Sequence, residues 1–513
     1  MILLLLQSIF IVDCILKSRQ WNIMIKVWKK LVILFSIGIV LTIFGLTAGI
    51  LWTTIYSYIL HTQLPLSPSS ANYGLWKETP IPMYLKLHMF NLTNEEDFIS
   101  GNGSKPHFVE LGPYVFREVD YKVQQIWNDN DTITYQRRRV WHFDESLSAG
   151  NLSDRITNLN PVAASVAYTL RYKSSFYRDV ADRIMKSLGQ KLIITRTVNE
   201  LLFEGYDDTM LKIARKMNLT KIPFSRFGWF YGRNGSDSYD GTYNMLTGKS
   251  NIHELGELKE WNYDSEVSYY PGECGKVKGT NGDLWPPLLN NQTVSFFVSD
   301  ICTSMSVTYV NTSTQEGVIG RKYSSDETIF DNGSKMQSHK CYCVGECIPP
   351  GALNISLCKW GAPAFISLPH FYLADPSYRE NIDGMNPSKE KHELSITIEP
   401  KTGVPLNVNA KLQLNLLVNH DKTMSMFRNV KTTFVPILWF SQEAYLTSDY
   451  ASMVKFIIIL ESLGSITFYG IAAIGILLIS ICLFLYIRHS LQGDETQVLL
   501  ATNDHVDISS ING

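Results

Sequence analysis

Two long apolar runs, one near each end of the chain, dominate the pattern of hydrophobic and polar positions. Residues 31–52 contain no charged side chain, and residues 465–487 form a second uncharged run. A bilayer core about 30 Å thick is spanned by roughly 20 apolar helical residues. A buried core helix of this length usually keeps a polar face. The pattern therefore predicts transmembrane helices over residues 31–54 and 465–487.

The charges around the first run predict its orientation. Before it stand Asp13 and five basic residues, Lys17, Arg19, Lys26, Lys29 and Lys30. Positively charged flanks remain in the cytosol, so residues 1–30 are expected to be cytosolic. With two spans, the tail of residues 488–513 is cytosolic as well. Residues 55–464 then form one large domain in a lumen or outside the cell.

The first 16 residues are also apolar, but the run before Asp13 is too short to span a bilayer. Basic residues follow this run instead of preceding it, and no small-residue cleavage site follows, unlike in a signal peptide. We expect Met24 to be the physiological start. Detection of a peptide from residues 1–16 in the mature protein would contradict this expectation.

Alternating apolar and polar positions in the middle of the chain predict β-strands. Val119, Tyr121 and Val123 alternate with charged or polar neighbours, which indicates a half-buried strand. Similar alternation occurs at 394–398, 404–408 and 412–416, and residues 400–403 (PKTG) read as a turn. The pattern predicts an antiparallel meander of three strands there.

One segment has a clear helical period. Its apolar side chains recur every four residues, at Tyr172, Phe176, Val180, Ile184 and Leu188. Along another face, Arg178, Asp182 and Lys186 are spaced to form ion pairs. A further helix is expected to begin near Asp208.

Composition narrows the possible partners. The formal net charge is -2 over 513 residues, which does not suit a nucleic-acid-binding protein. Ten Asn-x-Ser/Thr sites all lie in the segment that the charge rule places outside the cytosol, which supports that topology. The predicted glycosylation sites are Asn91, Asn102, Asn130, Asn151, Asn218, Asn234, Asn291, Asn311, Asn332 and Asn354.

Six of the eight cysteines lie in the same segment: Cys274, Cys302, Cys341, Cys343, Cys347 and Cys358. An even number in an oxidising compartment indicates three disulfides, in any of 15 pairings. The alternative is a zinc site built from His339 and its neighbouring cysteines. The Cys-x-Cys spacing of Cys341 and Cys343 fits zinc poorly.

No catalytic motif is complete. Gly248-Lys249-Ser250 resembles the end of a phosphate-binding loop, but Tyr243 occupies the position of the first glycine. His253-Glu254 begins like a zinc-protease helix without its second histidine. We therefore expect a protein that is not an enzyme and needs no cofactor or metal.

An ordered series of motifs resembles the class B scavenger receptor family. The resemblance covers residues 24–488 and is carried by 91–94 (NLTN), 111–118 (LGPYVFRE), 197–202 (TVNELL), 240–243 (DGTY), 297–302 (FVSDIC), 361–363 (GAP), 368–372 (LPHFY), 398–403 (IEPKTG) and 435–438 (VPIL).

The resemblance implies an α+β, membrane-anchored fold. Its large domain would be an irregular antiparallel β-barrel with a helical apex bundle, mapped to residues 161–220, and an internal apolar tunnel, flanked by two transmembrane helices. It also implies disulfides Cys274–Cys341, Cys302–Cys358 and Cys343–Cys347.

Family members bind ligands at the apex and are thought to pass lipid through the tunnel to the bilayer. Between Arg171 and Arg196, the mapped apex contains seven basic residues, against Asp179 and Asp182, which suits anionic partners such as lipoproteins, phospholipids or fatty acids. The basic residues are Arg171, Lys173, Arg178, Arg183, Lys186, Lys191 and Arg196. Some members place a lysine shortly before the position of Arg196 to meet a fatty-acid carboxylate, but this sequence has none at the matching place.

The C-terminal tail contains Glu495, Leu499 and Leu500 in the acidic dileucine pattern that clathrin adaptors read as an address for endosomes and lysosomes. Residues 190–192 (QKL) and 230–235 (FYGRNG) are similar to the lysosomal branch of the family. The cysteine pattern is similar to the cell-surface branch. Two functions remain: a receptor that transfers lipid to the lysosomal, endosomal or plasma membrane, and a sorting receptor that carries a lysosomal hydrolase.

Overall fold

The computed structural model describes residues 2–101, 104–216, 224–288 and 290–507, with side chains described between residues 26 and 491. The chain forms two compact units. One comprises residues 1–59 and 455–513, and the other comprises residues 60–454. Each unit is described by itself below.

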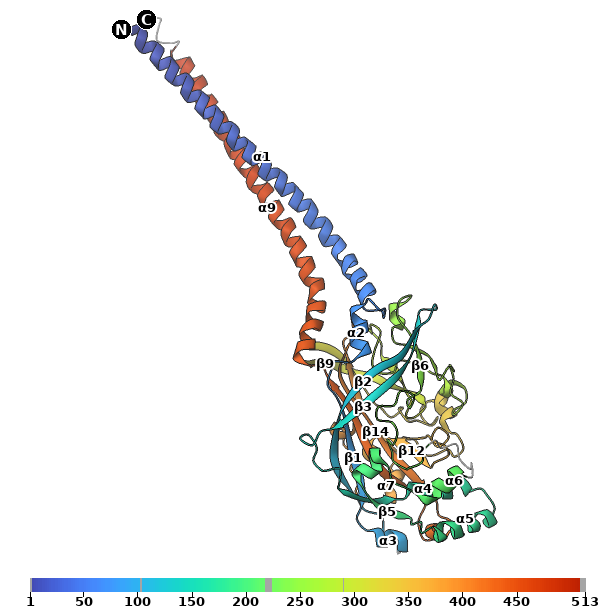
Figure 1. Ribbon diagram of the computed structural model, residues 1–513. Helices are drawn as coiled ribbons and strands as arrows, with labels where there is room; N and C mark the ends of the chain where they lie inside the picture. Colours follow the sequence, from blue (N-terminus) through green and yellow to red (C-terminus); the bar gives the residue numbers. More distant parts are fainter. Residues whose placement is uncertain (1, 102–103, 217–223, 289, 508–513) are drawn as a thin grey trace. The chain divides into compact units, whose positions relative to one another are not determined.

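The first unit consists of parts of two long helices, α1 (Ile2–Gln63) and α9 (Ser448–Asp507) (Figure 1). Within them, Lys26–Gln63 and Ser448–Leu491 are long and apolar enough to cross a membrane. Both apolar runs in the sequence are therefore helical, as predicted, and each helix continues well beyond its uncharged run.

The two helices pack closely against each other. A Cβ atom added at Gly45 would lie 2.5 Å from the backbone nitrogen of Ala472, so the glycine allows the close approach. The indole of Trp52 donates a hydrogen bond to the carbonyl oxygen of Glu461 (3.0 Å), and the Tyr56 hydroxyl donates to that of Ile457 (3.0 Å). Small residues and side-chain hydrogen bonds of this kind hold helices together in lipid, where the hydrophobic effect is absent.

The second unit is built mainly from antiparallel strands. The strands are β1 (Met83–Leu92), β2 (Phe108–Trp127), β3 (Thr132–Phe143), β4 (Arg155–Leu159), β5 (Ile193–Thr197), β6 (Thr242–Leu246), β7 (Leu258–Trp261), β8 (Thr293–Val298), β9 (Thr303–Gln315), β10 (Val318–Ser324), β11 (Ala352–Asn354), β12 (Ala364–Ser367), β13 (Ser395–Ile398), β14 (Pro405–Val418) and β15 (Thr433–Tyr445). The helices are α2 (Ala71–Lys77), α3 (Glu95–Ser100), α4 (Pro161–Leu170), α5 (Ser175–Ser187), α6 (Thr209–Lys216), α7 (Ser377–Glu380) and α8 (Lys389–His392).

Eleven strands form a nearly closed barrel in the order β7-β6-β3-β2-β1-β15-β14-β13-β10-β9-β8. A further pair, β11 and β12, joins the barrel through β14, and β4 pairs with β5 separately. The chain between β7 and β8 bridges the gap, because the Leu258 amide donates to Gly279 (2.9 Å) and the Phe297 amide donates to Thr280 (2.7 Å). The antiparallel barrel implied by the family resemblance is confirmed.

The predicted three-strand meander is wrong in one respect. Residues 395–398 do form a strand, but 405–408 and 412–416 belong to the single strand β14. The intervening residues stay extended because β15 pairs with β14 throughout, including Ala410 with Gln442 and Lys411 with Ser441. Neither Gly nor Pro interrupts this part of the sequence, and Asn409 takes its place in the ladder opposite Glu443.

The face of β2 that carries charge points inward, which reverses the expected orientation. Asp120 and Lys122 are 0% and 2% exposed, whereas Val119, Tyr121 and Val123 are half-buried. The charged side chains are accommodated because Lys122 pairs with Asp120 (2.8 Å) and with Asp283 (3.0 Å). Alternation correctly predicted the strand, but partners remote in sequence decided which face is buried.

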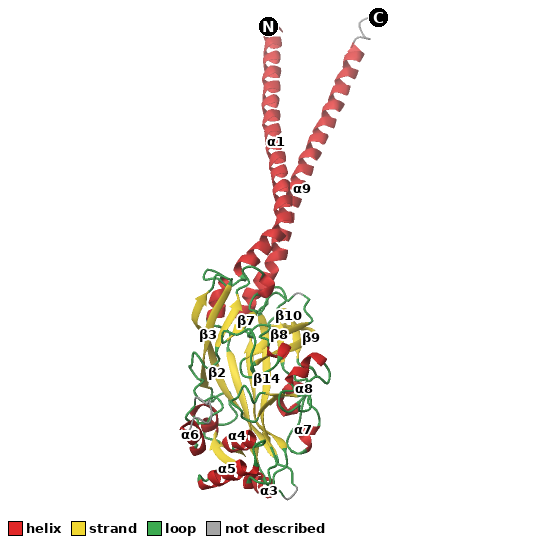
Figure 2. Ribbon diagram, turned by 90° about the vertical axis from the view of Figure 1, so that its right-hand side faces the viewer, coloured by secondary structure: helices red, strands yellow, loops and turns green. Residues whose placement is uncertain are grey.

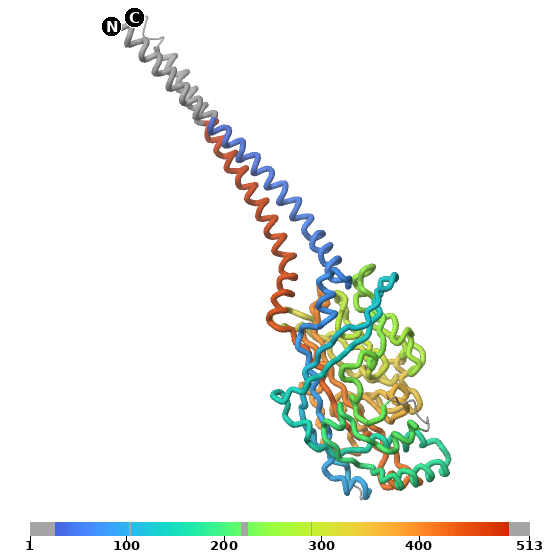
Figure 3. Tube along the Cα trace, viewed as in Figure 1, coloured from blue at the N-terminus to red at the C-terminus, as the bar shows by residue number. Residues whose placement is uncertain are grey.

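The helices α4, α5 and α6 gather at one end of the strands (Figure 2). They are tied to the chain that follows β14, since Asp182 of α5 accepts hydrogen bonds from the amide (2.9 Å) and hydroxyl (2.8 Å) of Ser425. Figure 3 shows the orange trace of this segment meeting the green trace of α5. Arg178 of α5 also pairs with Asp421 (2.9 Å).

Candidate functional site

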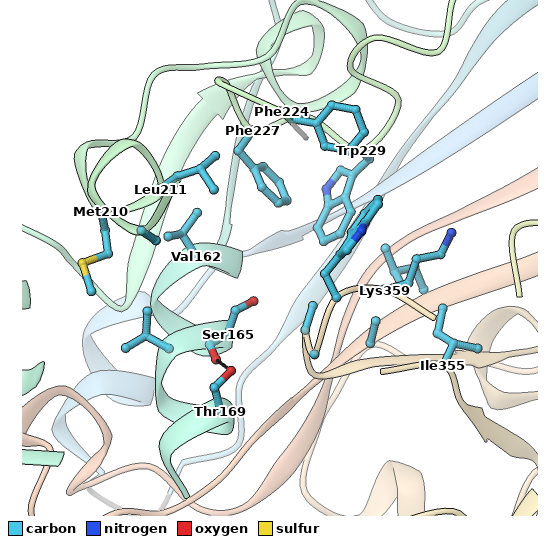
Figure 4. A pocket seen from close by; sticks show the side chains of 18 of the residues that line it. Val162, Ser165, Thr169, Met210, Leu211, Phe224, Phe227, Trp229, Ile355 and Lys359 are labelled. Carbon is cyan, nitrogen blue, oxygen red and sulfur yellow. Dashed lines mark hydrogen bonds between the residues drawn. The ribbon is translucent and has the colours of Figure 1, made fainter. Parts of the chain in front are cut away.

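A cavity of about 550 Å³ lies between these helices and the barrel. This volume is within the range of sites that bind small molecules. Most of its lining is apolar. Figure 4 shows labelled side chains from α4, from α6, and from the segments at residues 224–229 and 355–359. The wall that belongs to the barrel is formed by Ala364, Ile366, Leu414, Leu438 and Phe440.

Helix α4 forms one wall because a buried side chain fixes its start. Asn160 accepts hydrogen bonds from the amides of Val162 (3.0 Å) and Ala163 (3.3 Å), and Pro161 occupies the first turn, where its missing amide hydrogen is harmless. The Ser165 and Thr169 hydroxyls donate back to carbonyl oxygens of the same helix. The polar groups of α4 that line the cavity are therefore already satisfied.

Helix α6 forms a second wall and begins where predicted. Asp208 accepts a hydrogen bond from the amide of Leu211 (3.0 Å) and another from the side chain of Gln190 (3.0 Å). Met210, Leu211 and Ala214 line the cavity. The same Gln190 accepts from Asn160 (2.9 Å), so the starts of α4 and α6 are linked.

Helix α5 has the predicted helical period, but its apolar stripe is not a core face. Phe176 is 69% exposed, Val180 38% and Ile184 41%, and Tyr177 is also exposed. The residues that α5 buries are Ala181, Asp182 and Met185. Since Tyr177, Val180 and Ile184 also line the cavity, the exposed stripe of α5 is continuous with the cavity.

Charged side chains form part of the cavity lining. Arg233 is buried and pairs with Asp240 (2.8 Å) and Asp300 (2.9 Å). Burial lowers the pKa of Lys359, although nearby Asp300 acts in the opposite direction. Arg226 also lines the cavity, and it forms no ion pair among the residues that the structure describes.

The ion pairs continue into the barrel as a buried network. Arg139 pairs with Asp240 (2.6 Å), and Arg137 contacts both Asp120 (2.5 Å) and Asp283 (3.3 Å). Burial alone would raise the pKa of Asp120, but Arg137 and Lys122 outweigh it and hold this pKa well below its usual range. Each charge in this part of the interior is thus offset by a neighbour of opposite sign.

The predicted basic surface is partly neutralised. Four of its seven cations pair with carboxylates: Arg171 with Glu346 (3.2 Å), Arg178 with Asp421 (2.9 Å), Arg183 with Asp179 (2.8 Å) and Lys186 with Asp182 (2.9 Å). Lys173 and Lys191 are exposed without an ion pair among the described residues, and Arg196 lies over the ring of Tyr206. The expected charge excess is reduced because Glu346 and Asp421 come from distant segments.

Three disulfides join Cys274 to Cys341, Cys302 to Cys358, and Cys343 to Cys347. These are the pairs that the family resemblance implies. They use all the cysteines of the alternative zinc site, and no cluster able to hold a metal occurs among the described residues.

The predicted glycosylation sites differ in exposure. Asn130, Asn151, Asn234, Asn291 and Asn311 are exposed, Asn91 and Asn332 are half-buried, and Asn102 and Asn218 lie outside the described residues. Asn354 is buried in β11, and its side-chain nitrogen donates to Val344 (3.2 Å). Since a glycan would have to break this bond, we expect Asn354 to be unmodified.

Sequence reasoning missed most of the cavity. Phe224, Arg226, Phe227 and Trp229 line it, and the dense aromatic run at residues 224–231 was a signal that could have identified this wall. The sorting signal Glu495, Leu499 and Leu500 lies beyond the described side chains.

Comparison with known proteins places this architecture in context. The CD36 family model matches residues 36–486. Protein peste of Drosophila melanogaster is 35% identical over 418 residues, which cover 81% of this chain and 75% of peste. Scavenger receptor class B member 1 of Cricetulus griseus is 32% identical over 409 residues, 79% of each chain. Lysosome membrane protein 2 of Homo sapiens is 30% identical over 422 residues, 81% of this chain and 86% of that protein. This chain therefore belongs to the CD36 family, the class B scavenger receptors.

Proposed function

We propose that this protein is a two-span membrane receptor that binds an anionic single-chain lipid in the cavity and passes it through the barrel to the membrane. Both ends of the chain are cytosolic, and the barrel domain is glycosylated and faces a lumen or the outside. Helices α4, α5 and α6 form the surface that meets lipoproteins or other lipid carriers. The endosomal and lysosomal membranes are the proposed location.

The observation that carries this proposal is a largely apolar cavity with a few charged residues in its lining and an exposed apolar helix at its border. An acyl chain gains about 0.8 kcal/mol per CH₂ group on leaving water, so a cavity lined by Val162, Leu211 and Phe227 favours such a chain. Arg226, which forms no ion pair among the described residues, supplies a contact for a carboxylate. The lining residues Leu438 and Phe440 of β15 extend the apolar surface into the barrel wall.

The test is binding of a fluorescent fatty acid to the full chain in nanodiscs. Ala214→Trp fills part of the cavity and is expected to weaken binding at least about 10-fold, since one ligand position is lost. Ala149→Trp, at an exposed position outside the cavity, is the matched control and should bind normally. Equal affinity of both variants would contradict the proposed lipid site.

A second function, the carrying of a lysosomal hydrolase, is favoured by the exposed stripe of α5. Exposed Phe176 and Tyr177 form a T-shaped aromatic pair (5.7 Å between ring centres), and exposed aromatic side chains are common at protein interfaces. Phe176→Ser should then abolish co-purification of a lumenal hydrolase near pH 7 without changing fatty-acid affinity. Retained co-purification would exclude this surface as the cargo site.

A further inference from the structure

Three histidines and one glutamate form a cluster on the barrel wall, away from the cavity. Glu110 of β2 contacts the Nδ1 atom of His88 on β1 (2.8 Å) and the Nε2 atom of His370 (2.6 Å). The rings of His370 and His392 are stacked with their centres 4.4 Å apart. Both are buried, at 5% and 3% exposure. No residue of this cluster lines the cavity.

Hydrogen bonds define where each imidazole carries its proton. The Nδ1 atom of His370 accepts from the backbone amide of Asn386 (3.1 Å), and the Nδ1 atom of His392 accepts from that of Ser388 (2.9 Å). A neutral imidazole accepts at one nitrogen and donates at the other. Both rings therefore carry their hydrogen on Nε2, and His370 donates this hydrogen to Glu110.

These two bonds hold residues 385–392, which we call the strap. The strap begins after Gly384, whose φ of 94° and close approach to the Phe108 carbonyl oxygen require glycine, and it ends with α8 (Lys389–His392). Pro387 lies between Asn386 and Ser388 and has no amide hydrogen. The imidazoles thus accept both backbone hydrogens of residues 386–388.

The charges that face the two rings come from several elements. Glu110 lies on β2, His88 on β1, Lys411 on β14 and Lys391 on α8. Farther along the wall, Lys86 pairs with Glu443 of β15 (2.6 Å), and Lys322 of β10 pairs with Glu393 (3.0 Å). Among the described residues, Glu110 is the only acid that forms an ion pair with His370, and no acid forms one with His392.

We propose that the strap is released by acid, because protonation of His392 turns an acceptor of a backbone hydrogen bond into a donor. A proton added at Nδ1 of His392 points at the amide hydrogen of Ser388, so that bond breaks. Release uncovers the Glu110 side of the barrel wall in an acidic compartment and leaves the covalent chain and the barrel intact.

The direction and size of the pH effect follow from His392. Burial lowers the pKa of His392 to about 3, and the neighbouring His370 acts in the same direction. In the released strap this histidine titrates near its ordinary value of about 6.5. The closed strap is therefore favoured fully above pH 6.5 and loses its advantage as the pH falls from 6.5 toward 3. Between pH 7.4 and 5.0 the equilibrium shifts toward release by about 30-fold.

Hydrogen exchange of the full chain in nanodiscs, followed by mass spectrometry, tests the proposal. After correction for intrinsic exchange, protection of the Asn386 and Ser388 amides should fall about 30-fold from pH 7.4 to pH 5.0, while the amides of β1 and β15 keep their protection. Constant protection of these two amides, or a uniform loss across the barrel, would overturn the proposal.

A variant isolates the titrating group. His392→Asn places Oδ1 close to the position of Nδ1, so the Ser388 amide keeps an acceptor that does not titrate. The pH dependence at Ser388 should then largely disappear. His420→Asn, at an exposed position, is the matched control and should behave like the wild type. An unchanged pH dependence in His392→Asn would exclude His392 as the trigger.

Discussion

At the scale of single residues, two arginines that line the cavity differ in their partners. Arg233 is compensated by Asp240 and Asp300, so it belongs to the buried network. Arg226 lines the same cavity, and its Nε atom has no hydrogen-bond partner in the part of the chain that the structure describes. Only the assembled structure distinguishes these two arginines, because both occur in the same aromatic-rich stretch of sequence.

Arg226 is expected to recognise the ligand carboxylate. Arg226→Gln should weaken oleate binding about 10-fold or more, since a hydrogen bond to a charged group contributes about 1.5–3 kcal/mol. Methyl oleate, which has no carboxylate, should bind equally to wild type and variant. Arg215→Gln, at an exposed position nearby, is the control. An equal loss for methyl oleate would show that Arg226 acts through packing.

Asp331 is expected to stabilise its loop through ionisation. Burial raises its pKa, but the Ser334 hydroxyl and the amides of Met336 and Lys335 outweigh this effect and lower the pKa to about 2. Asp331→Asn should therefore cost about 2 kcal/mol of unfolding free energy at pH 7.

The same contribution should persist at pH 5 and disappear as the pH falls from about 4 toward 2, because a lowered carboxyl pKa stabilises only the ionised fold. Thermal unfolding at pH 7, 5 and 3 measures it. The control Asp129→Asn, at an exposed position, should unfold at the same temperature as the wild type at each pH. If Asp331→Asn lowers the unfolding temperature equally at all three pH values, the ionised form of Asp331 is not the cause of the stabilisation.

At the scale of elements, the local sequence pattern predicted whether a segment is a helix or a strand better than it predicted which other segments cover it. The period of α5 correctly indicated a helix, but a regular apolar stripe marks a core face only when another element covers it. The alternation in β14 correctly indicated extended chain. Asn409 is compatible with a turn between residues 408 and 412, and only the pairing of β14 with β15 shows that the chain stays extended there.

The start of α4 is expected to control the cavity wall. Asn160→Ala removes two acceptor contacts to the helix and the bonds to Gln190 and Lys191. We expect a loss of about 1–2 kcal/mol in stability together with weaker fatty-acid binding.

Asn251→Ala removes a similar contact to the His253 amide (3.1 Å) outside the cavity. This control should lose some stability and keep its fatty-acid affinity. Denaturant unfolding and lipid titration measure the two quantities separately. If Asn160→Ala also binds normally, the start of α4 does not set the ligand site.

At the scale of the whole molecule, three disulfides join separate parts of the chain and stabilise the fold. The disulfides connect segments 67, 56 and 4 residues apart. The residues that line the cavity lie between positions 162 and 440. Disulfides that join distant segments of this range therefore help to hold the cavity walls together.

Removal of Cys302–Cys358 is expected to cost about 4 kcal/mol, and removal of Cys343–Cys347 about 2 kcal/mol, because a longer closed loop restricts the unfolded chain more. Paired serine variants, compared by thermal unfolding, measure the difference. A larger loss from the short loop would show that local structure, and not chain entropy, dominates.

The tail signal is expected to set location independently of the fold. Leu499→Ala/Leu500→Ala should move the tagged protein from lysosomes to the cell surface, since clathrin adaptors would no longer bind. Unchanged lipid binding in the variant would confirm that only sorting is affected. If both proteins reside at the plasma membrane, lipid uptake at the surface becomes the function to pursue.

The sequence by itself determined the features that depend on local composition. Two uncharged runs specified the apolar helices, alternation and four-residue periods specified strands and α5, and ordered motifs specified the family. Only the tertiary structure decided which faces are buried: Asp120 and Lys122 point inward, the stripe of α5 stays exposed, and His392 stacks on His370. The reason is physical, because a period records that two faces differ, whereas the packing of distant segments decides which face leaves water.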